Sequence, residues 1–313
     1  MTELISVIIP TYKGSNTIID LVNEINNLFK NLNFEIVIIN DDSPDDSHSK
    51  LIDLQKKNNK IITYIKLAKN FGEYNAVMAG LRHCKGDIAV IIDDDFQHHP
   101  SEVLKLVHHS LSSNSDVVFT KYKDKKHSII RNLMSLVNNL TAKFLIQKPK
   151  DLYLSSFKTI KRNIIDIITK YEGNYVYIDG LILSYTNKIE SFEVKHHERV
   201  IGKSSYNSLK LFTHYLNLIT NFSIFPLRLF FIFGLAISLI SFIFLFFIFF
   251  EKIFNPQVPL GYSSLLSAIT FFSGIQILFL GFIGEYIGKI LKTVNKDHQY
   301  IIECIFKNQN LQK

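Results

Sequence analysis

The sequence predicts an α/β domain with a mostly parallel sheet, followed by a two-helix transmembrane hairpin. Short runs rich in Ile and Val alternate with helix-like segments up to residue 205, acidic residues end several of these runs, and the last third carries two long uncharged stretches. Near-continuous apolar strands are typical of a parallel sheet that helices cover on both faces. We expect the α/β domain at residues 1–205, an amphipathic juxtamembrane helix at 206–224, two transmembrane helices at 225–288 and a cytoplasmic tail at 289–313.

Five apolar runs are expected to form the strands, because each is short, rich in β-branched residues and bounded by polar residues. Segments with helical spacing separate them. The strands are expected at residues 4–12, 34–42, 60–68, 87–95 and 115–122, and the helices at 16–29, 45–57, 74–84 and 101–111. Ligands of such sheets bind beyond the carboxyl ends of the strands, so the residues that follow these runs form the candidate site.

Composition and motifs exclude several classes of protein. The chain has 313 residues, a formal net charge of +7 and 47% hydrophobic residues. Cys84 and Cys304 are far apart and lie in no zinc-binding spacing, so we expect two free thiols and neither a structural zinc nor a disulfide framework. The first residues lack the basic and apolar regions of a signal peptide, which favours a cytoplasmic start. Neither G-x-G-x-x-G nor a P-loop motif is present, and we expect no nucleic-acid partner.

Two apolar stretches are long enough to cross a bilayer. Leu229 to Phe250 and Tyr262 to Gly284 contain no charged residue, and about 20 apolar residues span the hydrocarbon core. A pair of buried core helices is the alternative, but the rest of the chain offers no soluble surface large enough to cover them. Basic residues flank the pair on the outside, so we expect both termini in the cytoplasm. Residues 208–222 suit a helix along the membrane surface or an ordinary core-facing helix.

The run IIDDDFQHHP, residues 91–100, places three carboxylates side by side at a strand end. Alternate residues of an extended strand face the same side, so Asp93 and Asp95 can point together while Asp94 points away. Gln97 can reach the same place from the following turn. Two carboxylates and an amide oxygen suit Mg²⁺ or Mn²⁺, which take few protein ligands and complete their shell with water and phosphate. A solvated turn is the alternative for so short a motif.

Other acidic and histidine motifs have more ordinary interpretations. Residues 41–45 spell the DDxxD pattern by which helical prenyl diphosphate synthases hold magnesium, but here the pattern follows a strand and contains Pro44. Asp42 or Ser43 can instead cap the helix expected at 45–57. The three His pairs, at 98–99, 108–109 and 196–197, are expected on the surface or beside the site, because adjacent histidines seldom bind one ion together.

Seven motifs, in this order, resemble the polyprenyl-phosphate glycosyltransferases of the family 2, GT-A type, over nearly the whole chain. They are VIIPTY, NDDSPDDS, KNFGEYNAVMAGL, DDDFQHHP, HHERVIGKSSY, FSIFPLRL and GFIGEYIGKI. The resemblance implies a Rossmann-like GT-A domain, a Mg²⁺ or Mn²⁺ cofactor, and a tetrameric homo-oligomer in the bacterial inner membrane.

The resemblance also implies which residues bind the nucleotide. Pro10, Tyr12, Asp41 and Asp93 would line its site, with Asp41 on the base. The two carboxylates and the glutamine of the D-x-D-x-Q motif would hold the metal on the donor diphosphate. Tyr-Lys-Gly at residues 12–14 replaces the family's usual Tyr-Asn-Glu, so the family's Glu contact to the nucleotide is missing here.

Basic residues later in the chain are implied for the phosphates. Arg131 and Ser135 would meet the acceptor phosphate, and Arg199 would close over the phosphates from a loop. Lys203 would act with Arg199, and we also assign it to the acceptor phosphate. Asp93, Asp95 and Arg199 are the expected catalytic residues.

Together these features predict a membrane-bound, inverting glycosyltransferase. It would move a sugar from a nucleotide sugar, expected to be a UDP-sugar, to undecaprenyl (polyprenyl) phosphate for cell-envelope glycan or lipopolysaccharide modification. The acceptor phosphate is largely deprotonated at neutral pH, so a strong general base is unnecessary. The alternatives are a processive polysaccharide synthase, which the absence of Trp disfavours, and a non-catalytic nucleotide-sugar-binding membrane scaffold.

Overall fold

The structure, a computed structural model, describes residues 3–58, 61–122, 152–173, 175–194, 261–294 and 298–307, with isolated helical positions between 232 and 254. The chain divides into two compact units, one of residues 1–206 with 296–313 and one of residues 207–295. The first unit is therefore built from both ends of the chain, and the second is inserted between them.

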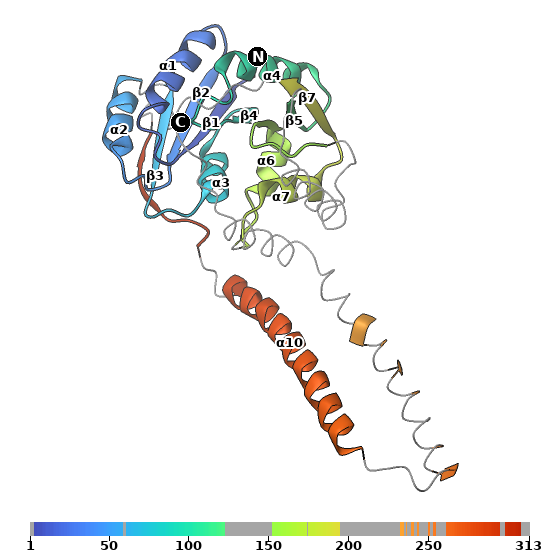
Figure 1. Cartoon of the computed structure of the whole chain (residues 1–313). Helices are drawn as coiled ribbons and strands as arrows, with labels where there is room; N and C mark the ends of the chain where they lie inside the picture. Colours follow the sequence, from blue (N-terminus) through green and yellow to red (C-terminus); the bar gives the residue numbers. More distant parts are fainter. Residues whose placement is uncertain are drawn as a thin grey trace. The chain divides into compact units, whose positions relative to one another are not determined.

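A mixed sheet of eight strands forms the centre of the first unit in the described part of the chain (Figure 1). The strands are β1 Ile5–Thr11, β2 Phe34–Asn40, β3 Ile62–Leu67, β4 Ile88–Ile91, β5 Val117–Tyr122, β6 Lys158–Lys161, β7 Ile189–Val194 and β8 Ile302–Phe306. Their order across the sheet is β7-β5-β6-β4-β1-β2-β3-β8. β1 is parallel to β2 and β4, and β2 is parallel to β3, whereas β6 and β8 are antiparallel to their neighbours. The predicted mostly parallel sheet is confirmed, and all five predicted strands are present.

Helices pack on both faces of this sheet. They are α1 Ile18–Leu28, α2 Ser47–Lys57, α3 Glu73–His83, α4 Pro100–Ser112, α6 Arg162–Ile168 and α7 Ile178–Tyr185. α1 contacts α2 and α4, while α3 lies against β1 and β2, and α6 contacts α7. α1 to α4 correspond to the four predicted helices, with ends that differ by a few residues.

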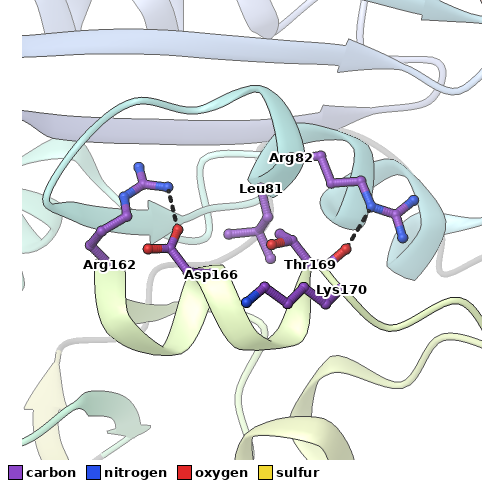
Figure 2. Close-up of a pocket in the computed structure, with 6 residues that line it drawn as sticks. All are labelled: Leu81, Arg82, Arg162, Asp166, Thr169 and Lys170. Atoms are coloured by element: carbon purple, nitrogen blue, oxygen red, sulfur yellow. Dashed lines mark hydrogen bonds and ion pairs between the residues drawn. The ribbon is translucent and has the colours of Figure 1, made fainter.

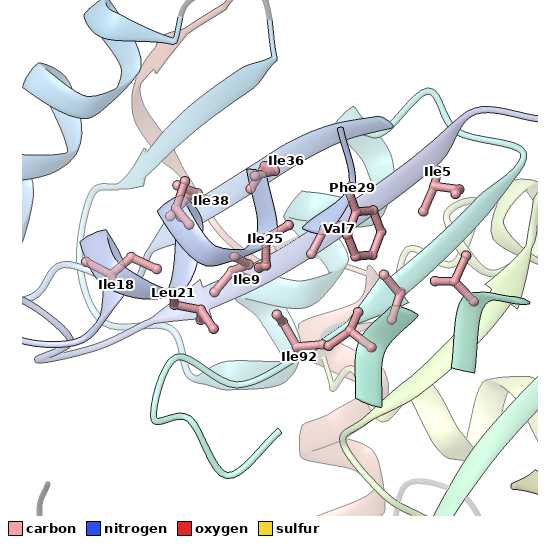
Figure 3. Close-up of a cluster of buried hydrophobic side chains, with 14 of the residues drawn as sticks. Ile5, Val7, Ile9, Ile18, Leu21, Ile25, Phe29, Ile36, Ile38 and Ile92 are labelled. Atoms are coloured by element: carbon pink, nitrogen blue, oxygen red, sulfur yellow. The ribbon is translucent and has the colours of Figure 1, made fainter. Parts of the chain in front are cut away.

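Alternate residues of β1 face opposite sides of the sheet, and helices cover both sides, which explains why every residue of the strand is buried. Ile5, Val7 and Ile9 pack with α1 in the main hydrophobic core (Figure 3). On the other face, Ile8 and Ile39 meet α3 at Gly80, where a Cβ would lie 2.6 Å from Ile8 Cγ2 and 2.7 Å from Ile39 Cδ1. Glycine therefore allows the close approach of α3 to the sheet.

The end of the chain adds β8 to the edge of the sheet, a strand that the sequence did not indicate. The backbone N–H of Ala68, just after β3, donates to the carbonyl of Ile301 at 2.9 Å. The Phe306 ring stacks on Tyr64, with 5.8 Å between centroids. Gln299 Nε2 donates to the carbonyls of Tyr171 at 2.8 Å and Gly173 at 2.7 Å. The predicted tail is thus an integral part of the first unit at residues 299–306.

The second unit contains the helix α10, Tyr262–Val294. Its segment Phe271–Gly288 is long and apolar enough to cross a membrane, and none of that segment is buried. This is the one such helix among the described residues. The first predicted span, residues 229–250, is described only at isolated helical positions, and the predicted helix at 206–224 lies outside the described residues.

Candidate active site

The loops that follow β1, β2 and β4 meet at one edge of the sheet, because these neighbouring strands are parallel. Hydrogen bonds join the first two loops. The backbone N–H of Lys13 donates to Ser43 Oγ at 3.0 Å, and that of Ser15 donates to Asp45 Oδ2 at 3.2 Å. The Thr11 hydroxyl joins the loops after β1 and β4 by donating to Asp94 Oδ2 at 2.5 Å. Hydrogen bonds therefore link the three segments into one continuous surface at this edge of the sheet.

Each of these loops contains a non-glycine residue with positive φ. They are Lys13 at 63°, Asp42 at 54° and Phe96 at 61°. Such conformations cost free energy and persist where the surrounding structure fixes them, most often at functional sites. Close packing requires a glycine at position 14, because a Cβ there would collide with the side chains of Asp94 and Thr11, which are bonded to each other. The residues with positive φ therefore lie at the same edge of the sheet as the acidic motif.

The three adjacent aspartates have three different partners. Asp93 Oδ2 accepts from Ser156 Oγ at 2.9 Å, and Asp95 Oδ1 accepts from the backbone N–H of Gln97 at 3.1 Å. Asp94 is bonded to Thr11 on the neighbouring strand. β4 ends at Ile91, so the aspartates lie in the chain that turns toward α4 rather than on the strand itself. The shared orientation of Asp93 and Asp95 and their role as metal ligands stay predictions.

The two histidines of this run differ in environment. His98 is buried, its ring stacks on Phe157 with 4.6 Å between centroids, and its Nδ1 accepts from the backbone N–H of Asp93 at 3.4 Å. His99 is the N-cap of α4 and accepts from the backbone N–H of Ser101 at 3.3 Å. His98 thus helps to orient Asp93, a role that the sequence alone did not assign.

Negative charge accumulates at this edge. Burial raises the pKa of Asp94 to about 6 against the opposing Thr11 hydrogen bond, and Asp93 and Asp95 raise it further. Partial loss of hydration, followed by the Asp93 carboxylate, raises the pKa of Glu73 at the start of α3 above its ordinary value, although the residue is exposed to solvent. A bound cation would relieve the repulsion that contributes to both shifts.

The donor set fits a small divalent cation better than a metal that prefers nitrogen or sulfur. No group of three His, Cys, Asp or Glu side chains in the described residues could hold a metal. The donors predicted from the sequence are the carboxylates of Asp93 and Asp95 and the Gln97 amide. Such oxygens suit Mg²⁺ or Mn²⁺, which leave much of their shell to water and substrate, and the convergence of the three on one ion stays a prediction.

Three predicted nucleotide residues lie at the carboxyl ends of β1 and β2: Pro10 within β1, Tyr12 just after it, and Asp41 just after β2. Pro10 is buried opposite Ile39, and Tyr12 is 45% exposed. Asp41 is buried, and its two carboxylate oxygens accept from the backbone N–H groups of Phe71 at 2.7 Å and Gly72 at 2.8 Å. Asp41 therefore holds the chain that enters α3, and its contact with the base stays a prediction.

The expected capping of the second helix by Asp42 or Ser43 is wrong. α2 begins at Ser47, and it is Asp45 Oδ1 that accepts from the Ser47 backbone N–H at 3.2 Å. The N-cap of α2 is Asp46, four residues after Asp42, and the Asp42 carboxylate lies 3.5 Å from Lys66 Nζ.

A charged pair that the sequence did not reveal lies beside the acidic turn. Lys158 is opposite Ile91 in the sheet, and its ammonium group bonds to Asp179 in the first turn of α7. Both side chains are buried. The Tyr74 and Tyr177 rings, 5.4 Å apart, join the starts of α3 and α7. Only the register of β6 brings these residues to the site, so no local sequence signal could have indicated them.

A separate pocket of about 460 Å³ lies at the other end of α3, lined by Leu81, Arg82, Arg162, Asp166, Thr169 and Lys170. Figure 2 shows Arg162 directed toward Asp166 and Arg82 bonded to the carbonyl of Thr169. Arg82 also donates to the carbonyl of Tyr171, and Arg162 to that of Gly86. The two arginines thus bond the backbone carbonyls of neighbouring loops and stabilise the fold, and we assign the pocket no substrate.

Four predicted phosphate-binding residues cannot be placed. Arg131, Ser135, Arg199 and Lys203 lie outside the described residues. Their roles stay predictions.

Comparison with known proteins agrees with this arrangement. Residues 6–168 match the model of glycosyl transferase family 2, and residues 225–290 match that of the GtrB C-terminal hairpin. An undecaprenyl-phosphate 4-deoxy-4-formamido-L-arabinose transferase of Klebsiella pneumoniae (strain 342) is 29% identical over 97% of this chain and 94% of that protein. A Bacillus subtilis (strain 168) protein that carries the name glycosyltransferase CsbB is 31% identical over 98% of this chain and 94% of its own length.

Solved structures add a likeness of fold. Glucosyl-3-phosphoglycerate synthase from Mycobacterium tuberculosis, crystallised with Mn²⁺, UDP and phosphoglyceric acid, has a TM-score of 0.50. Its sequence identity is 18%, over 70% of this chain and 76% of that one. From its family model and its near full-length relatives, the chain belongs to glycosyl transferase family 2 and is a glycosyltransferase.

Proposed function

We propose that this chain is a membrane-bound, inverting glycosyltransferase that moves a sugar from a UDP-sugar to undecaprenyl phosphate. One observation carries the proposal: the unit that contains the family 2 match and the acidic turn also contains residues 296–313, and the segment inserted between its two parts matches the GtrB C-terminal hairpin. The name of the Klebsiella relative, which covers nearly the whole chain, supports undecaprenyl phosphate as the acceptor. A lipid acceptor also gives the membrane segment a purpose. Modification of cell-envelope glycan or lipopolysaccharide is the pathway that we propose.

The chemistry needs a nucleophile, an anomeric carbon and a leaving diphosphate. An oxygen of the acceptor phosphate attacks the anomeric carbon, and the bond from that carbon to the nucleoside diphosphate breaks on the opposite face, so the configuration inverts. The acceptor is already deprotonated at neutral pH, since its second pKa is near 6. Asp93, Asp95 and Gln97 would hold Mg²⁺ or Mn²⁺, which when bound would offset the charge that develops on the leaving diphosphate.

The surrounding residues keep this acidic turn in place. Ser156 bonds the Asp93 carboxylate, His98 accepts from the Asp93 backbone N–H, and Thr11 holds Asp94 toward β1. Asp41 fixes the peptide before α3. An active site that relies on electrostatic stabilisation needs charges that are held before the substrate arrives.

The placement of β8 supports a two-span topology. β1 near the start of the chain and β8 near its end belong to one sheet, so the inserted segment must cross a membrane an even number of times. α10 supplies one crossing, and the uncharged stretch at residues 229–250 is the candidate for the other. With the basic flanks inside, both termini and the catalytic unit would be cytoplasmic, at the inner membrane. A tetrameric homo-oligomer is part of the proposal by family resemblance.

Labelled nucleotide sugars test the function directly. Membranes that contain the protein are incubated with a panel of labelled nucleotide sugars and undecaprenyl phosphate, with and without EDTA, beside the Asp95→Ala variant. We expect labelled lipid from at least one donor, its loss in EDTA, its return with Mn²⁺ or Mg²⁺, and none from the variant. Absence of labelled lipid with every donor would contradict the function, and labelling that EDTA leaves unchanged would contradict the metal.

A further inference from the structure

The carboxylates at the strand-end edge are almost all bonded within the chain. Asp41 accepts from two backbone N–H groups, Asp93 from Ser156, and Asp94 from Thr11, while Asp179 bonds to Lys158. Asp95 accepts from the backbone of Gln97. Glu73 differs, because within the described residues its carboxylate has neither a hydrogen bond nor an ion pair. It is the acidic group at this edge that remains available to a ligand.

The structure holds Glu73 in place through its backbone and its neighbours. It is the first residue of α3, directly after Gly72, whose φ of 90° turns the chain into the helix. The Gly72 backbone N–H is fixed by Asp41, and the Tyr74 ring is fixed against Tyr177. The carboxylate is therefore anchored on a rigid element although solvent reaches it.

The charges around Glu73 indicate which part of a substrate it can accept. The adjacent Tyr74 packs against Tyr177, two residues before Asp179, and Asp179 bonds to Lys158, which lies opposite Ile91 just before the acidic turn. The lysine is already bonded to Asp179, so the surroundings are net acidic and repel phosphate groups. A carboxylate in such a place accepts hydrogen bonds from neutral hydroxyl groups or from amines.

The acidic turn contains Asp93, the predicted ligand of the metal on the donor diphosphate, and the Asp93 carboxylate also acts electrostatically on Glu73. In a nucleotide sugar, the group joined directly to that diphosphate on its far side is the sugar. We propose that Glu73 accepts a hydrogen bond from a hydroxyl or amino substituent of the transferred sugar and so helps to select the donor. This inference rests on the proposed function, because it places the sugar beside the acidic turn.

The test compares the sugar-bearing donor with the nucleotide alone. Full-length Glu73→Ala and Glu73→Gln are purified in detergent, with Asp53→Asn, an exposed carboxylate on α2, as the matched control. Calorimetry with Mn²⁺ measures the Kd of UDP, UDP-glucose, UDP-N-acetylglucosamine and UDP-xylose. We expect Glu73→Ala to weaken the tightest UDP-sugar about 10- to 100-fold, as the loss of a hydrogen bond to a charged group predicts. UDP itself should change less than about twofold.

The other variants separate the role of the charge from that of the fold. Glu73→Gln keeps one acceptor oxygen and should show a smaller loss, while Asp53→Asn should match the wild type. An unchanged UDP-sugar affinity in Glu73→Ala would overturn the inference. So would an equal loss for UDP and UDP-sugar, because that result assigns Glu73 to the nucleotide or to the fold. Failure of the proposed function would show differently, as binding without transfer to undecaprenyl phosphate.

Discussion

The carboxylate of Asp41 holds the entrance of α3, and replacing it by an amide should destabilise the first unit measurably. In Asp41→Asn one of the two oxygens becomes an NH₂ group, which faces a backbone N–H of Phe71 or Gly72 where the structure has bonds of 2.7 and 2.8 Å. A hydrogen bond to a charged group contributes about 1.5–3 kcal/mol, and a buried donor left unpaired costs about 1–3 kcal/mol. Because both contributions describe the same lost hydrogen bond, they do not add fully. We expect the free energy of unfolding to fall by about 3 kcal/mol.

That loss converts to a fall in Tm of about 6–12 °C for a unit of this size, at roughly 2–4 °C per kcal/mol. Circular dichroism is the suitable assay because the chain contains no Trp. Asp42→Asn is the matched control, since Asp42 is half-exposed and pairs with Lys66 at 3.5 Å. Exposed pairs contribute at most about 1 kcal/mol, and Asn tolerates positive φ. A fall in Tm for Asp41→Asn no larger than that of the control would refute the reasoning.

Three further predictions concern the core, the buried pair and pH. Gly80→Ala should destabilise by about 1–3 kcal/mol in denaturant unfolding, because the new methyl group overlaps Ile8 and Ile39; a change within error would contradict the close packing. Lys158→Met should cost about 3–5 kcal/mol in the same assay by leaving the buried Asp179 unpaired, and the double variant Lys158→Met/Asp179→Leu should recover part of the loss. In EDTA, Tm should fall as pH rises from 4 to 7, because the pKa of Asp94 is about 6 in the folded protein, above its ordinary 3.8. The stabilisation from protonated Asp94 is complete below pH 3.8 and is lost as pH rises through 6. If the Tm of Asp94→Asn falls as steeply with pH as that of the wild type, the titration of Asp94 is not the cause.

Features that depend on local pattern were predictable from the sequence. β1 to β5 and α1 to α4 follow from runs of Ile and Val between segments of helical spacing, and the meeting of Pro10, Asp41 and Asp93 at one edge follows from parallel pairing. Features that depend on distant pairing were not. β6 is a four-residue strand in a mixed segment, and its register alone brings Lys158 to the site. The amide partners of Asp41 are 30 and 31 residues away in the chain.

The return of the chain to the sheet has a consequence for biosynthesis. Lys66 of β3 bonds to Glu303 of β8 across 237 residues. At about 5–20 residues per second, translation takes roughly 10–50 seconds to cover that interval. During this time β3 is an unpaired edge, a state prone to wrong strand pairing. Because residues 207–295 are made before β8, the sheet is completed only after the whole inserted unit has been synthesised, and until then the first unit lacks one of its edge strands.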